Sequence, residues 1–194
     1  MHKILFFILF TISSTAFASD LMLCLGCHNE QNTMNPTISG QHSKYIENQL
    51  KYFKNDKRIN AIMQGISKTL DDNQIKTISK EFSEKKWVNS KNITKEANKA
   101  KGKRFAQVGN CLGCHGFDLK GQSNIPRLAG QDKNYLLQTM LKFKKHEHKH
   151  YPMMNSMVAR YSEQDLDVLA DYLSGLGKCC LLYTSPSPRD LVIS

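Results

Sequence analysis

Cys24-Leu25-Gly26-Cys27-His28 is the stretch that decides the fold, because the chain contains it twice. The same five-residue pattern recurs 87 residues later as Cys111-Leu112-Gly113-Cys114-His115. A second segment follows each copy: Pro36–Gln41 reads Pro-Thr-Ile-Ser-Gly-Gln, and Pro126–Gln131 reads Pro-Arg-Leu-Ala-Gly-Gln. The order and spacing of the repeated residues hold along both halves. The chain is therefore a tandem duplication of one small unit.

The Cys-x-x-Cys-His pattern is the attachment signature of c-type haem. Two thiols three positions apart can form thioethers to both vinyl groups of one porphyrin, and the adjacent histidine then reaches the iron from the same side. The pattern predicts two covalently bound haem c groups. The predicted attachment residues are Cys24, Cys27, Cys111 and Cys114. The predicted axial ligands from these motifs are His28 and His115.

Three other uses of the cysteines fit the sequence less well. A structural zinc site could use four cysteines, but 83 residues separate Cys27 from Cys111, which is more than such sites usually span. A redox-active Cys-x-x-Cys is expected beside a βαβ pattern, which is missing. Plain disulfides would leave the two motif histidines unexplained. Haem attachment accounts for all six motif residues.

Methionine is predicted to be the second axial ligand of each iron. Met63 lies 35 residues after His28, and Met154 lies 39 residues after His115. Each stands eight residues before the expected start of a helix, so the repeat register pairs them. Unpaired methionines are more often core filler, and Met153 and Met157 compete for the role in the second unit. The register selects Met154.

Apolar residues at helical spacing predict an all-α fold, and period-2 alternation is nearly absent. Small units of this kind cannot bury a large core and usually need an added staple. Helices are expected over 43–55 and 132–145, from Asp71 or Asp72, from Ser162 and over 93–108, with a linker over 85–92. The chain is expected to divide into an N-terminal segment (1–18), the first repeated unit (19–90), the second repeated unit (91–177) and a C-terminal tail (178–194).

The two ends of the chain are expected to lie outside the repeated units. Residues 2–18 have a short basic start, an apolar stretch and a small-x-small site, which predicts an export signal cleaved after Ala18. An uncleaved anchor is the alternative. Residues 178–194 match nothing in the repeat and resemble a translated assembly artefact, with a real flexible tail as the alternative. The vicinal Cys179 and Cys180 are therefore left out of the haem count.

The charge of the chain indicates possible binding surfaces but no nucleic-acid role. The 194 residues include 27 Lys and Arg against 17 Asp and Glu, a formal net charge of +10. An exported basic protein can meet anionic lipid headgroups or an acidic partner, and nucleic acid is not expected there. The run His146–His150 could catch a metal ion, but a solvated loop is the preferred interpretation.

These residues resemble the tandem dihaem class I cytochromes c of the c4 type, over roughly residues 20–177. The resemblance rests on both haem motifs, both Pro-to-Gln segments and both Met-to-helix registers. It implies two tandem cytochrome c domains, each wrapped around one covalent haem, that carry electrons in the periplasm. It also implies that the carbonyls of Pro36 and Pro126 accept the Nδ1–H of the motif histidines. Finally, it implies a basic residue near each haem propionate: Arg58 in the first domain and His148 at the matching position of the second.

The first domain departs from the family pattern before its haem motif. Only Ser19–Leu23 separate the predicted cleavage site from Cys24, so the usual N-terminal helix is nearly absent. The second domain keeps this helix, with Gly102 and Phe105 placed to pack against the last helix near Leu169 and Tyr172. The first domain is therefore expected to be less stable or to expose its haem more.

Electron transfer is the favoured function, because His/Met ligation fills both axial positions and leaves no site for a substrate at iron. The expected partners are a cytochrome bc1-type donor and a terminal oxidase acceptor. One alternative is a tightly bound or membrane-tethered subunit of a respiratory complex, and another is a dihaem peroxidase. If His148 lies beside a propionate on a solvated loop, its charge is expected to vary near neutral pH.

Overall fold

The computed structural model describes residues 15–29 and 34–177. Within these residues the chain forms helices and no strand, apart from one isolated bridge between Gln122 and Ile125. The all-α prediction is confirmed. The helices are α1 Thr15–Cys27, α2 Ser43–Lys54, α3 Ala61–Thr69, α4 Asp72–Glu84, α5 Glu96–Val108, α6 Cys111–His115, α7 Lys133–Lys144, α8 Pro152–Ala159 and α9 Glu163–Gly175.

The first half of the chain builds its core where α2 packs against α4. Apolar residues recur at helical spacing on both helices, so each presents one apolar face. From α1, Leu21, Cys24 and Leu25 pack against the same cluster. The buried cluster consists of Ile46, Leu50, Ile75, Ile78 and Phe82.

The second half repeats this arrangement on a larger scale. Here α9 packs against both α5 and α7, and α7 also contacts α8. A Cβ on Gly102 would collide with the Tyr172 side chain, so the absence of a side chain lets α5 approach α9 closely, as expected. The buried cluster consists of Ala106, Leu119, Ala129, Leu136, Met140, Phe143, Val158, Tyr161, Leu166, Leu169, Ala170 and Leu173.

Side-chain caps begin the last helix of each half, at the starts that the sequence predicts. Asp71 accepts a hydrogen bond from the Gln74 N–H, and the Gln74 side chain accepts one from the Asp71 N–H. Ser162 and Asp165 form the equivalent capping box at α9. Each box satisfies backbone N–H groups that have no partner within the helix.

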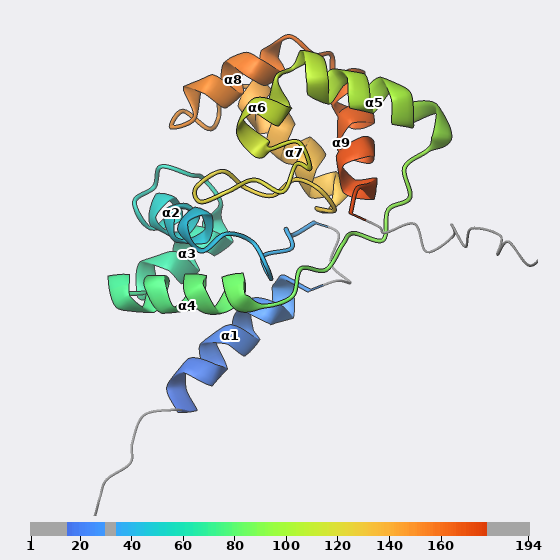
Figure 1. Cartoon of the computed structure of the whole chain (residues 1–194). Helices are drawn as coiled ribbons and strands as arrows, with labels where there is room; N and C mark the ends of the chain where they lie inside the picture. Colours follow the sequence, from blue (N-terminus) through green and yellow to red (C-terminus); the bar gives the residue numbers. More distant parts are fainter. Residues whose placement is uncertain (1–14, 30–33, 178–194) are drawn as a thin grey trace, which may run out of the picture.

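The two halves face each other across their loops. In Figure 1 the α2–α4 group and the α5–α9 group lie on opposite sides of the loops that precede α2 and α7. Direct hydrogen bonds join these loops, for example between the ring Nε2 of His42 and the Lys120 carbonyl, 2.8 Å apart. The segments that follow the two haem motifs therefore form part of the interface.

The described residues bear only partly on the predicted ends of the chain. Helix α1 begins at Thr15 and runs through Ser19–Leu23 into the first motif, so a helix does precede Cys24. Its first four residues belong to the segment predicted to be cleaved. Residues 1–14 and the predicted tail, 178–194, lie outside the described residues. No helix of the described part combines the length and apolar character needed to span a bilayer.

Candidate functional site

Each haem motif lies on a turn of helix. Cys24 and Cys27 belong to the last turns of α1, and the His28 N–H continues the helical pattern by donating to the Cys24 carbonyl at 2.9 Å. In the second half, α6 consists of the motif itself. Residues three and four apart share one side of a helix, so each turn brings two thiols and one imidazole together. The four motif cysteines are thiols and form no disulfide among the described residues.

The two motif histidines are held in the same way. Nδ1 of His28 lies 2.9 Å from the Pro36 carbonyl, and Nδ1 of His115 lies 2.8 Å from the Pro126 carbonyl. These are the hydrogen bonds that the family resemblance implies. Because Nδ1–H donates to a carbonyl, Nε2 carries the lone pair that can bind iron. Burial lowers the pKa of both histidines, which favours the neutral, metal-binding ring.

The two methionines occupy the same position in equivalent helices. Met63 is the third residue of α3, and Met154 is the third residue of α8. Both are half-buried and pack against the core of their own half. By contrast, the Met153 side chain is 63% exposed. This placement supports Met154 over Met153.

Arg58 lies between the two halves of the molecule. Its guanidinium donates to Gln49 Oε1 at 2.5 Å and to the Tyr135 hydroxyl of the second half at 3.2 Å. It also stacks on the Phe53 ring, 4.8 Å from the centroid. Burial opposes ionisation of Tyr135, but the guanidinium outweighs it and brings the pKa of the phenol below its ordinary value.

Comparison with known proteins identifies the family. The family model for cytochrome c matches residues 99–177. A cytochrome c4 from Thiocapsa roseopersicina is 30% identical over 172 residues, which cover 80% of this chain and 88% of that protein. The chain belongs to the cytochrome c4 family. The cytochrome c4 structure from Acidithiobacillus ferrooxidans agrees, with 29% identity, a TM-score of 0.72, and coverage of 82% of this chain and 99% of that one.

Membership of the cytochrome c4 family makes the chain an electron carrier that binds haem c covalently. A further relative, from Thiomonas intermedia, is a thiosulfate dehydrogenase electron acceptor. It is 26% identical over 167 residues, which cover 78% of this chain and 77% of that protein.

Buried polar atoms without a partner provide a test of whether the residues fit haem. Among the described residues, both ring nitrogens of His148, together with Ser67 Oγ and Asn155 Oδ1, are buried and make no hydrogen bond. Buried polar groups are nearly always hydrogen-bonded in native proteins. Ser67 lies one helical turn after Met63, and Asn155 directly follows Met154. A polar prosthetic group beside these methionines fits both the donor set and the unsatisfied atoms.

The structure corrects the prediction that His148 belongs to a solvated loop. His146, Glu147 and Lys149 are exposed, but His148 is only 4% exposed and packs edge-on against Phe143. Burial lowers its pKa to about 3, and the nearby positive charge of Arg58 acts in the same direction. The ring is therefore neutral near pH 7, and the prediction that its charge varies there is wrong. The composition of the loop is polar, but the fold places it against Tyr52 of the first half, whose ring centroid lies 4.3 Å from that of His150.

Two site residues escaped the sequence analysis. Gln41 and Gln131 end the repeated Pro-to-Gln segments, and each forms hydrogen bonds with the backbone of the other half. Their repetition was visible in the sequence. Their contacts were not, because they join segments about 90 residues apart.

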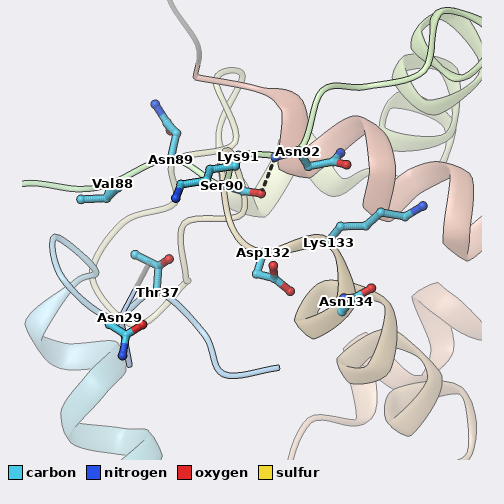
Figure 2. A pocket seen from close by; sticks show the side chains of 10 residues that line it. All are labelled: Asn29, Thr37, Val88, Asn89, Ser90, Lys91, Asn92, Asp132, Lys133 and Asn134. Carbon is cyan, nitrogen blue, oxygen red and sulfur yellow. Dashed lines mark hydrogen bonds between the residues drawn. The ribbon is translucent and has the colours of Figure 1, made fainter. Parts of the chain in front are cut away.

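A pocket of about 270 Å³, lined mostly by residues with polar side chains, lies beside these contacts, beneath the linker between the halves. Figure 2 shows the linker residues Val88–Asn92 above Thr37 of the first half and Asp132 at the start of α7. A neighbouring pocket reaches from Thr37 to His28. The environment of His28 is thus more open than that of His115, which is 6% exposed.

Proposed function

We propose that this cytochrome c4 relative holds two covalent haem c groups and transfers single electrons between respiratory-chain proteins in the periplasm. Cys24 and Cys27 would attach the first haem, and Cys111 and Cys114 the second. The observation that carries the proposal is the equivalence of the two halves. In both, a motif histidine donates to a proline carbonyl and a methionine occupies the third position of a short helix.

Each iron would be held by one histidine and one methionine, His28 with Met63 and His115 with Met154. Haem supplies a metal centre that accepts and releases one electron, and histidine with methionine raises its potential. The protein's own part is to fix both axial side chains so that little rearranges when the charge changes. The Pro36 and Pro126 carbonyls orient the imidazoles. The short helices α3 and α8 would present the methionines, so that in each half the methionine comes from a different segment than the motif histidine.

The polar side chains at the interface between the two halves would contact the haem propionates. Arg58 supplies a permanent positive charge at the interface between the halves. His148 is neutral there and supplies an N–H group that has no acceptor among the described residues. We propose that Arg58 and His148 contact propionates, the first through charge and the second as a neutral hydrogen-bond donor.

The physiological partners proposed are a cytochrome bc1-type donor and a terminal oxidase acceptor. The relative that accepts electrons from thiosulfate dehydrogenase supports exchange with other redox proteins, including dehydrogenases of inorganic substrates. A formal charge of +10 favours acidic partners or brief contact with anionic membranes.

Potentiometric titration of the purified protein, combined with turnover assays, tests this function. The proposal expects two one-electron steps, low-spin spectra for both haems in both oxidation states, and rapid reoxidation by membranes that contain a terminal oxidase. Turnover of hydrogen peroxide at a high-spin haem would favour the peroxidase alternative and contradict the proposal.

A further inference from the structure

Gln41 and Gln131 make reciprocal contacts between the two halves. The Gln41 side chain accepts from the Arg127 N–H at 2.9 Å and donates to the Arg127 carbonyl at 3.2 Å. Gln131 makes the same pair of bonds with Thr37, at 2.8 and 2.9 Å. Both glutamines are almost fully buried, at 2% and 3% exposure. In each half, one glutamine side-chain amide is therefore hydrogen-bonded to the backbone N–H and C=O of one residue in the other half.

The N–H groups that the two glutamines accept from belong to the same peptide groups whose carbonyls hold the axial histidines. In the first half, the C=O of the Pro36–Thr37 peptide accepts from Nδ1–H of His28, and its N–H donates to Oε1 of Gln131. One peptide plane thus connects an iron ligand of the first domain to a side chain of the second. The second half has the equivalent set, formed by His115, the Pro126–Arg127 peptide and Gln41.

This connection has an electronic consequence. Hydrogen bonds in a chain polarise one another, so a peptide that donates through N–H accepts more strongly through C=O. A stronger acceptor draws the Nδ1 proton and makes the imidazole a more basic ligand. A more basic axial ligand favours ferric over ferrous iron and lowers the reduction potential of that haem.

We propose that Gln41 and Gln131 are positioning residues for the haem of the opposite domain. Each fixes and polarises the peptide that orients the other domain's axial histidine. The inference rests on the proposed two-haem function and adds to it a means by which docking of the domains sets both reduction potentials. Loosening the interface raises both potentials, because each histidine then loses part of its acceptor.

The turn before each glutamine holds its side chain in place. Gly40 and Gly130 have φ values of +73° and +76°, which side chains rarely allow, and a Cβ at either position would collide with the linker. Their N–H groups donate to the last helix of their own half, at Phe82 and Leu173. Oε1 of Gln131 also accepts from the Asp132 N–H at 2.9 Å. The amides are therefore aimed by backbone on both sides of the interface.

The test replaces each glutamine by methionine, which has similar volume and no hydrogen-bonding amide. Both potentials are measured in the haem-loaded protein, with each haem assigned by its own spectrum. Gln41→Met should raise the potential of the second haem more than that of the first. Gln131→Met should raise the potential of the first haem more than that of the second. A residue that only stabilises its own domain would shift its own haem instead.

His42→Leu is the matched control, because it removes a neighbouring interdomain hydrogen bond without touching either proline peptide. This variant should not produce the crossed pattern, in which a substitution in one domain shifts mainly the potential of the other domain's haem. Shifts confined to the domain that carries the mutation, or equal shifts in all three variants, overturn the inference while leaving two haems in place. A wild-type protein without two His/Met haems overturns the proposed function as well.

A second measurement covers the case in which a variant does not assemble. In the wild-type protein the backbone amides of Thr37 and Arg127 should exchange slowly with solvent, although Thr37 borders a pocket. Rapid exchange of these two amides would overturn the inference, since the glutamines would then not hold them.

Discussion

The two halves of the molecule hold their predicted haem ligands alike but pack their cores differently. The bonds from His28 to Pro36 and from His115 to Pro126 differ by only 0.1 Å, at 2.9 and 2.8 Å. Yet among the described residues the buried apolar cluster has five members in the first half and twelve in the second. Duplication has kept the ligand geometry and let the core change. The geometry is therefore held by short-range bonds and by the interface, and depends little on core size.

The strongest way to break this comparison is to remove one axial methionine at a time. Met63→Ala should convert only the first haem to a high-spin or ligand-exchanged form, and Met154→Ala only the second, because each helix serves its own half. Absorption and magnetic spectra of the ferric protein measure the change. Met153→Ala is the control and should leave both spectra intact, since that side chain is exposed. A change with Met153→Ala and none with Met154→Ala would show that the repeat register is misleading.

The unequal cores can be tested at equivalent positions. Phe82 and Leu173 are almost fully buried, and their carbonyls accept the equivalent N–H groups of Gly40 and Gly130. Phe82→Ala should lower the free energy of unfolding by about 3–5 kcal/mol, and Leu173→Ala by about 2–5 kcal/mol.

Thermal unfolding followed at each haem separately would measure these losses. Because the first core is smaller, Phe82→Ala should unfold the first domain while the second stays folded. Leu173→Ala should leave the larger core able to rearrange. Simultaneous unfolding of both halves in Phe82→Ala would mean that the domains do not differ in independent stability.

How far the sequence could predict this structure follows from the range of the interactions. The caps at Asp71 and Ser162 and the helix after Ser43 were predictable, because capping and apolar spacing act within a few residues. Helices α3 and α8 were not predicted. They are short, and α8 begins at a proline in a methionine-rich segment with weak periodicity.

The motif ligands were predictable from spacing, whereas the interface was not. The loop that carries His148 meets the other half, where His150 contacts Tyr52 and the charge of Arg58 acts on His148, and no local pattern encodes these contacts. The glutamines that end the repeated segments were visible as a repeat, but their partners follow only from the docked structure.

A smaller difference between the halves lies at Asp171, whose equivalent in the first half is the exposed Lys80. Asp171 accepts from the Lys95 N–H at 3.0 Å and from the Asn98 side chain at 2.9 Å, which ties α5 to α9. Burial disfavours its charge, but the hydrogen bonds from Asn98 and Asn92 outweigh burial and lower its pKa.

A carboxylate with a lowered pKa stabilises the folded state above its unfolded pKa, and this contribution is lost as the pH falls through the folded value. Asp171→Ala should therefore lower the free energy of unfolding of the second domain by about 1–3 kcal/mol near pH 7 and by less in acid. Unfolding of the second domain at pH 7 and pH 3 measures this loss. Lys80→Ala should change neither value, and an equal loss at both pH values would contradict the role of the charge.

The smallest expected effect concerns His148 between pH 7 and 9. Because burial and the nearby Arg58 lower its pKa, the ring stays neutral there and His148→Gln should leave the pH slope of the second haem's potential unchanged. Below the ordinary value of 6.5, the unfolded chain gains a proton that the folded chain does not. Stability should therefore fall as the pH drops below 6.5, and less in the variant. A slope near pH 7 that disappears in His148→Gln would contradict the assigned neutral state.

The mass of the denatured protein tests the central claim most directly, because thioether bonds survive denaturation. If both halves are equivalent haem-binding domains, the exported protein carries two haem groups per chain. Replacing Cys111 and Cys114 by serine should remove one of them and leave the other attached. A single haem in the wild-type protein, or none, would contradict the account.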